Sequence, residues 1–178
     1  MTRQGESEMN IAREARKLVA YLMGKTSEIQ ELDVKDVLMA KAILDIHRTR
    51  TRKDLVSLPL YALEPIHRLD RETALRAVEG RAAALREHRA AICEAGGITC
   101  ELLAEILPSV SWIKVVEEAP ESYLVFEGNG RLAAMRQVFG PDDGITVEVE
   151  LYRFRNPRKI VRRLNRVRRL NGLMPEEV

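Results

Sequence analysis

Aromatic residues are scarce in this chain of 178 residues, at 4% of the sequence, although 46% of its residues are hydrophobic. Any core must therefore be built mainly from Leu, Val, Ile and Ala. The chain is long enough to bury one core of this kind and to carry a further segment beside it. Length and composition favour one domain with an appendage.

Long apolar runs and a signal-like leader are also missing. No run approaches the roughly 20 residues that a membrane span requires. The first ten residues, MTRQGESEMN, are polar. We therefore expect a cytoplasmic protein with no membrane partner.

Cysteine occurs only twice, as Cys93 and Cys100. Two thiols are too few for a metal cluster, and both fall near helical, partly apolar positions. We predict that they are reduced and structural, and we expect neither a metal site nor redox chemistry from them.

The formal net charge is only +2, but the charge is unevenly distributed. Nine Arg or Lys residues and no acidic residue lie between Arg153 and Arg169, whereas glutamates are concentrated in segments 117–121 and 148–150. The basic character therefore belongs to the C-terminal segment.

Two helices are predicted before residue 54. One can run from Ser7 to Gly24, and a second can begin at Asp33, where apolar residues recur at helical spacing. Residues 1–53 are assigned as a helical extension that packs on the domain as a structural lid or forms a homodimer contact. His47, which lies beside a basic stretch, is predicted to be at the surface.

Residues 54–155 alternate between strand-like and helix-like hydrophobic periods. Strands are predicted over 55–63, 112–116, 123–127 and 145–152, and helices over 71–95, 99–107 and 132–139. Gly140 is expected to cap the last of these helices. Strict alternation in 145–152 predicts one buried and one solvated face. The pattern predicts an α+β domain, with a small mixed sheet and packed helices.

The stretch YLVFEGNGRLAAMRQV, residues 123–138, changes from strand period to helical period at a polar loop. The first N–H groups of a helix have no internal partner, and the helix dipole favours an anion there. Gly128 and Gly130 allow a ligand to approach the backbone, and Arg131 offers donors that a phosphate can accept. The alternative is an ordinary strand-to-helix turn with a solvated arginine.

Gly128, Arg131 and Ala134 form a G-x-x-R-x-x-A pattern after a strand, which resembles the signature of the ParB/sulfiredoxin-like superfamily. The resemblance covers residues 54–155. Segment 56–65, VSLPLYALEP, is similar to the opening strand of those domains, and the order of later elements matches. The resemblance implies a bacterial protein that binds a nucleotide or another phosphorylated small molecule, with CTP or ATP and Mg²⁺ as the expected ligands.

The resemblance also implies roles for single residues. The backbone of Gly128, Asn129 and Gly130 would cradle phosphates, and Arg131 would neutralise them. Asn129 would bind a phosphate or a sugar, and Glu127 would hold a cation or act as a base. His67 would be a second acid–base group, or would instead fill a loop or cap a helix. These roles raise the hypothesis of a nucleotide triphosphatase or kinase.

The same loop differs from individual members of the superfamily. Asn129 replaces the catalytic cysteine of sulfiredoxin, which argues against thiol repair. Asn129 and Gly130 replace a Glu–Arg pair of ParB proteins, and two histidines of a related serine kinase are missing. EGNGR also occurs in Fic-type nucleotidyl transferases, although Tyr123 and Ala134 stand where their histidine base and second arginine would be. A degenerate Fic-like transferase is the remote alternative.

Residues 156–178 are assigned as a basic amphipathic helix, with Asn156 as N-cap and Pro157 in the first turn. Its basic side is predicted to include Arg158, Lys159, Arg162, Arg163, Arg166 and Arg169. Such a helix can contact nucleic-acid phosphates, lie on an acidic membrane, or dock its apolar stripe and leave a solvated basic face. The stripe lacks bulky aromatic residues, which argues against membrane insertion. The alternative function is therefore a DNA-associated partition or regulatory factor.

Overall fold

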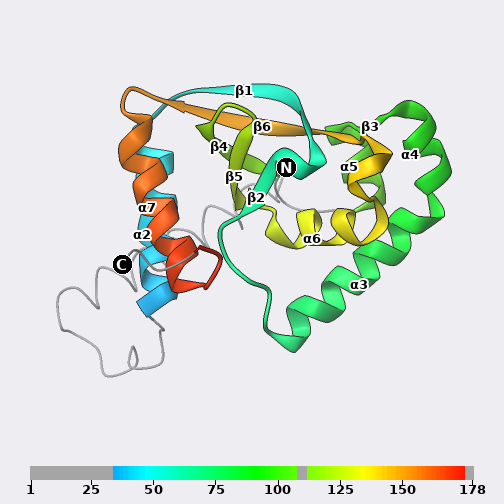
Figure 1. Ribbon diagram of the computed structural model, residues 1–178, viewed down its shortest axis with the longest axis horizontal. Coiled ribbons are helices and arrows are strands. Elements are labelled where there is room, and N and C mark those ends of the chain that lie inside the picture. The colour runs from blue at the N-terminus through cyan, green and yellow to red at the C-terminus, as the bar shows by residue number, and fades with distance from the viewer. Residues whose placement is uncertain (1–33, 108–111, 175–178) are drawn as a thin grey trace, which may run out of the picture.

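The computed structural model describes residues 34–107 and 112–174, and the helix predicted from Ser7 to Gly24 lies outside them. The strands are β1 Arg50–Pro59, β2 Leu63–Pro65, β3 Gly97–Ile98, β4 Lys114–Ala119, β5 Ser122–Glu127 and β6 Thr146–Phe154. The helices are α2 Val34–Thr49, α3 Glu72–Glu87, α4 Arg89–Ala95, α5 Cys100–Ile106, α6 Asn129–Val138 and α7 Pro157–Leu170. The α+β class is therefore confirmed (Figure 1).

One mixed sheet joins all six strands in the order β1-β6-β4-β5-β2, with β3 paired to β6. β6 pairs antiparallel with β1 and parallel with β4, while β4 and β5 form an antiparallel hairpin. β2 is parallel to β5 and lies at the edge of the sheet. The mixed sheet was predicted. The sequence left open which strands pair parallel and which antiparallel, and the structure decides this.

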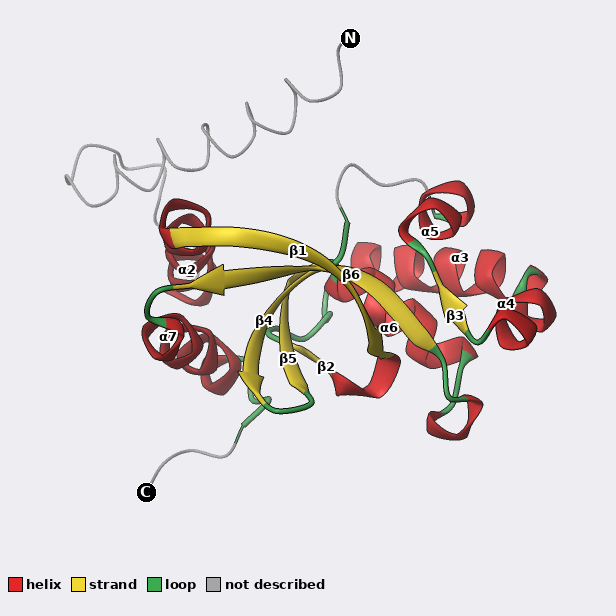
Figure 2. Ribbon diagram, turned by 90° about the horizontal axis from the view of Figure 1, so that it is seen from above, coloured by secondary structure: helices red, strands yellow, loops and turns green. Residues whose placement is uncertain are grey.

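The sheet separates two apolar cores. Val125 of β5 belongs to the core that includes buried residues of α3 to α6, whereas its neighbours Leu124 and Phe126 belong to the core formed with α2 and α7. This division follows from the alternation of side chains along a strand. Figure 2 shows α2 and α7 together at one end of the sheet and α3 to α6 at the other.

The prediction of one solvated face on β6 is wrong at Tyr152, which is only 3% exposed. Tyr152 is part of the core under α2 and α7, because these two amphipathic helices cover that end of the sheet. Farther along the same face, Glu150 accepts a hydrogen bond from Lys53 Nζ at 2.9 Å and Glu148 from the Cys100 amide at 2.8 Å. The polar residues of this face are therefore partnered.

The single helix predicted over 71–95 is wrong, because the chain divides at His88 into α3 and α4. His88 adopts φ −103° and ψ 4°, outside helical geometry. Arg89, directly after it, donates to both oxygens of Asp143 and to the Val138 carbonyl. These contacts tie the start of α4 to the turn that follows α6.

The strand predicted over 55–63 begins earlier, at Arg50, and ends at Pro59 before a short 3-10 turn, Leu60–Ala62. The predicted cap at Gly140 is also wrong. α6 ends with Phe139 in an extended conformation, and Gly140, at φ −82°, donates its amide to Asp143 before the 3-10 turn Pro141–Asp143.

α7 docks its apolar side on the sheet and on α2, with Ile160, Leu164 and Val167 buried. Arg163 pairs with Asp45 of α2, and Arg168 pairs with Glu118 of β4. Of the three roles considered for this helix, the structure shows the one in which its apolar stripe docks on the protein. Within residues 34–107 and 112–174, no helix combines the length and apolar character that crossing a membrane requires.

Leu164→Ala should lower the free energy of unfolding by about 2–5 kcal/mol, because it removes a fully buried side chain and leaves a cavity between α7 and the sheet. Leu170→Ala is the matched control in the same helix, since Leu170 is 39% exposed. Urea unfolding measures both values. Equal effects of the two substitutions would contradict the docking of α7.

Candidate functional site

The predicted order of strand, loop and helix is present at the β5–α6 junction. β5 ends at Glu127, Gly128 adopts a left-handed conformation with φ +99°, and α6 begins at Asn129. The loop is therefore one residue long, and the predicted helix start at Leu132 is wrong, because α6 begins three residues earlier. Asn129, Gly130 and Arg131 form the first turn of the helix, because the positive φ of Gly128 completes the change of direction by itself.

Gly128 and Gly130 make room for two arginine side chains. A Cβ on Gly128 would lie 2.9 Å from Ile113 Cγ1 and 3.3 Å from Arg131 Nη2. A Cβ on Gly130 would lie 2.9 Å from Nη1 of Arg81, a residue of α3. Both guanidinium groups therefore lie directly against the backbone at the start of α6.

Asn129 is 5% exposed and links three parts of the junction. Its Oδ1 accepts a hydrogen bond from the Ile66 amide at 3.1 Å, and its Nδ2 donates to the Val125 carbonyl at 3.0 Å. The amide side chain therefore holds the end of β2 and the strand β5 against the start of α6.

Arg131 is 6% exposed, and within the described residues its side chain makes no hydrogen bond or ion pair. Burial, together with the charge of Arg81, lowers the pKa of Arg131 to about 10. Arg81 also has no hydrogen-bonded or ionic partner in the described part of the chain. A buried charge without a partner costs free energy, and a second cation beside it adds to that cost.

Two backbone amides at the same place are open. The Arg131 and Leu132 amides both donate to the Gly128 carbonyl at 3.0 Å. The amides of Asn129 and Gly130 find no acceptor among the residues that the structure describes. Together with the helix dipole, these two amides and the two guanidinium groups present only donors and positive charge.

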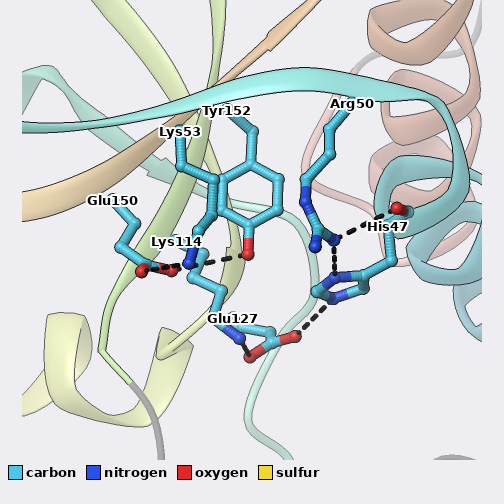
Figure 3. A network of polar contacts seen from close by, with 7 residues as sticks. All are labelled: His47, Arg50, Lys53, Lys114, Glu127, Glu150 and Tyr152. Carbon is cyan, nitrogen blue, oxygen red and sulfur yellow. Dashed lines mark hydrogen bonds and ion pairs between the residues drawn. The ribbon is translucent and has the colours of Figure 1, made fainter.

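The carboxylate of Glu127, the last residue of β5, belongs to a polar network (Figure 3). Its Oε1 accepts from His47 Nε2 at 3.1 Å, and its Oε2 accepts from Lys114 Nζ at 2.6 Å. Arg50 Nη1 donates to His47 Nδ1 at 3.0 Å. Because Nδ1 is the acceptor, the proton of a neutral His47 is on Nε2.

Burial alone would raise the pKa of Glu127, but the hydrogen bonds from His47 and Lys114 hold it below its usual value. Glu127 is therefore an ionised carboxylate with both oxygens engaged. The residues present do not fit a magnesium ion held by Glu127, because Lys114 Nζ already neutralises this carboxylate at 2.6 Å and would repel a second cation there. In the described residues no group of three or more His, Cys, Asp or Glu side chains is arranged to hold a metal.

The surface position predicted for His47 is wrong, since its side chain is only 24% exposed. Its ring makes edge contacts with Phe126 and Tyr152, at centroid distances of 6.1 and 5.7 Å. The packing of α2 on the sheet brings His47 to Glu127, which is 80 residues away in the chain. No local sequence pattern indicates this contact, and none indicates that Arg81 reaches Gly130.

The second predicted acid–base residue, His67, lies next to Ile66 and donates from Nδ1 to the Arg68 carbonyl at 3.0 Å. None of the polar contacts found among the described residues joins His67 to Glu127 or Arg131. The structure therefore does not bring the two predicted catalytic side chains into direct contact.

The residues predicted to bind nucleic acid divide into two groups. Arg163 is paired with Asp45, and Arg169 is half-buried with interactions of its own. The other four are exposed on the outer side of α7, namely Arg158, Lys159, Arg162 and Arg166.

Both cysteines are free thiols in the structure. Burial and the nearby Glu148 raise the pKa of Cys100 to about 12, and its Sγ donates to the Glu148 carbonyl. A thiol with a pKa this high is a poor nucleophile at neutral pH.

Comparison of the chain with protein-family models, curated proteins and solved structures finds no match. The chemistry of the site is therefore interpreted from its own geometry.

Asn129→Ala should lower the free energy of unfolding by about 1–3 kcal/mol, because it leaves the buried Ile66 amide and Val125 carbonyl without their partner. Gln137→Ala is the control, since Gln137 is exposed in the same helix. Chemical denaturation of both variants provides the measurement. A loss no greater than that of the control would show that Asn129 does not hold the junction.

Glu127→Gln should weaken the dependence of stability on acid pH. A carboxylate whose pKa is lowered on folding stabilises the protein above its unfolded pKa, and this contribution is lost as pH falls through the lowered value. We expect the wild type to lose more free energy of unfolding than the variant between about pH 7 and about pH 3. Exposed Glu87, substituted by Gln, is the control, and identical pH profiles for both variants would contradict the pairing of Glu127.

Proposed function

We propose that the start of α6 binds the phosphate group of a small molecule, as the resemblance to ParB/sulfiredoxin-like proteins implies. The observation that carries this proposal is the buried guanidinium of Arg131, which feels the positive charge of Arg81 and forms no direct hydrogen bond or ion pair with any described residue. A bound dianion offsets the cost of burying one charge and the repulsion between the two.

The donor set suits a tetrahedral phosphate. Two guanidinium groups provide planar donor pairs that phosphate oxygens accept, and the Asn129 and Gly130 amides provide two further donors at the positive end of the helix dipole. Asn129 takes part through its backbone, because its side chain holds the junction. The candidate ligands are the di- or triphosphate of a nucleotide, such as CTP or ATP, and simpler phosphate compounds.

The proposal is one of binding, and it includes no step through a metal. Glu127 is adjacent to the site, but its oxygens are occupied by Lys114 and His47. Its charge still acts on the site, because it partly offsets the lowering of the Arg131 pKa. Glu127 therefore reduces the positive potential at the site without contacting the ligand.

Thermal unfolding in a buffer free of phosphate and sulfate tests this function. Pyrophosphate, CTP and ATP are added separately, each with and without Mg²⁺. A ligand at 100 times its Kd should stabilise the wild type by about 2.7 kcal/mol. Arg131→Met should remove this stabilisation, and without ligand it should be as stable as the wild type or more so, because it replaces a buried unpaired charge by an apolar side chain.

Two substitutions in α3 extend the test: Arg81→Met changes the second arginine of the proposed site, and Arg86→Met is the matched control. Arg81→Met should weaken the effect of the ligand, whereas Arg86→Met should not, because Arg86 is exposed and points from a different side of α3, more than one turn after Arg81. The proposal fails if none of the three ligands stabilises the wild type. It also fails if Arg131→Met loses several kcal/mol without ligand, since Arg131 would then have a structural role.

A further inference from the structure

The end of α2, the start of β1, the end of β6 and the start of α7 meet at one end of the sheet (Figure 1). Residues of these four segments line a basic cleft. It has a volume of about 490 Å³. Four cationic side chains line it, from Arg48, Arg155, Lys159 and Arg163. It is separate from the phosphate site, because none of its lining residues belongs to the β5–α6 junction or to α3.

The cleft has an excess of positive charge that the described residues do not balance. Asp45 is the one acidic side chain among its lining residues, and it is paired with Arg163. Arg48, Arg155 and Lys159 make no side-chain hydrogen bond or ion pair within the described part of the chain. Three unpaired cations therefore converge on one hollow.

The positive charge continues beyond the cleft along α7. Lys159 belongs both to the cleft and to the exposed side of the helix, where Arg158, Arg162 and Arg166 follow at four-residue spacing. Four residues of a helix rise about 6 Å, so these three cations form a row about 12 Å long. A row of this length exceeds the size of a single phosphate and matches a repeating polyanion.

We propose that the cleft and the exposed side of α7 bind the phosphate backbone of duplex DNA without reading its sequence. Arg48, Arg155 and Lys159 hold a phosphate in the cleft, and Arg158, Arg162 and Arg166 contact phosphates farther along. Protein–DNA interfaces are polar and strongly positive, whereas protein–protein interfaces have an apolar core. The apolar stripe of α7 is buried in the protein, so this surface cannot provide such a core and cannot insert into a membrane.

Fluorescence anisotropy with a labelled duplex of about 20 base pairs, at salt concentrations from about 50 to about 200 mM, tests this inference. Six phosphate contacts predict a loss of affinity of about 10³-fold over this range. Two double variants, Arg48→Gln with Lys159→Gln and Arg162→Gln with Arg166→Gln, each remove two contacts. Each should bind more weakly at low salt and should reduce the loss over the range by about tenfold.

Arg76→Gln with Arg86→Gln is the matched control, because it makes the same change of charge on the exposed side of α3. Thermal unfolding checks that each variant is folded. The control should bind like the wild type, and an equal loss in the control would overturn the inference by showing that net charge alone decides binding. Absence of duplex binding by the wild type would overturn it, as would displacement of the duplex by polyglutamate at equal charge, which would indicate an acidic protein partner.

Discussion

The amide side chain of Asn129 is the contact on which the candidate site depends. Its two hydrogen bonds join the end of β2, the strand β5 and the first turn of α6. The junction is held from within, the amides of Asn129 and Gly130 have no acceptor among the described residues, and both arginine side chains lie close to its glycines. One polar side chain thus provides the geometry, and the charge comes from Arg81 and Arg131.

Two groups of charged residues, of opposite balance, lie near the junction. Glu127 is held by His47 of α2 and Lys114 of β4, whereas Arg131, four residues later, lies against Arg81 of α3. The negative group is fully partnered and the positive groups are not. This asymmetry is the basis for proposing an anion as the ligand, although an acidic residue is directly adjacent to the site in the sequence.

Several helix ends could be predicted from local sequence patterns, because capping depends only on residues that are neighbours in the chain. Thr99 caps α5 by accepting from the Leu102 amide, Asn156 caps α7, and Gly96 ends α4 in a left-handed conformation, as their residue types indicate. The break at His88 was not predictable, because the apolar stripe continues through it. The contacts of Arg89 with a turn about 50 residues away direct the chain there.

By itself, the sequence determined that a strand runs into a helix at Gly128, since only glycine takes a positive φ at little cost and the hydrophobic period changes at that point. It also determined the amphipathic, basic character of α7. Only the tertiary structure decided which charges meet: Arg81 and Arg131 at one site, His47 and Glu127 at another, and Arg48 with Lys159 in the cleft. The physical reason is that electrostatic interactions depend on distance in space, and distant segments are brought together only when the helices pack on the sheet.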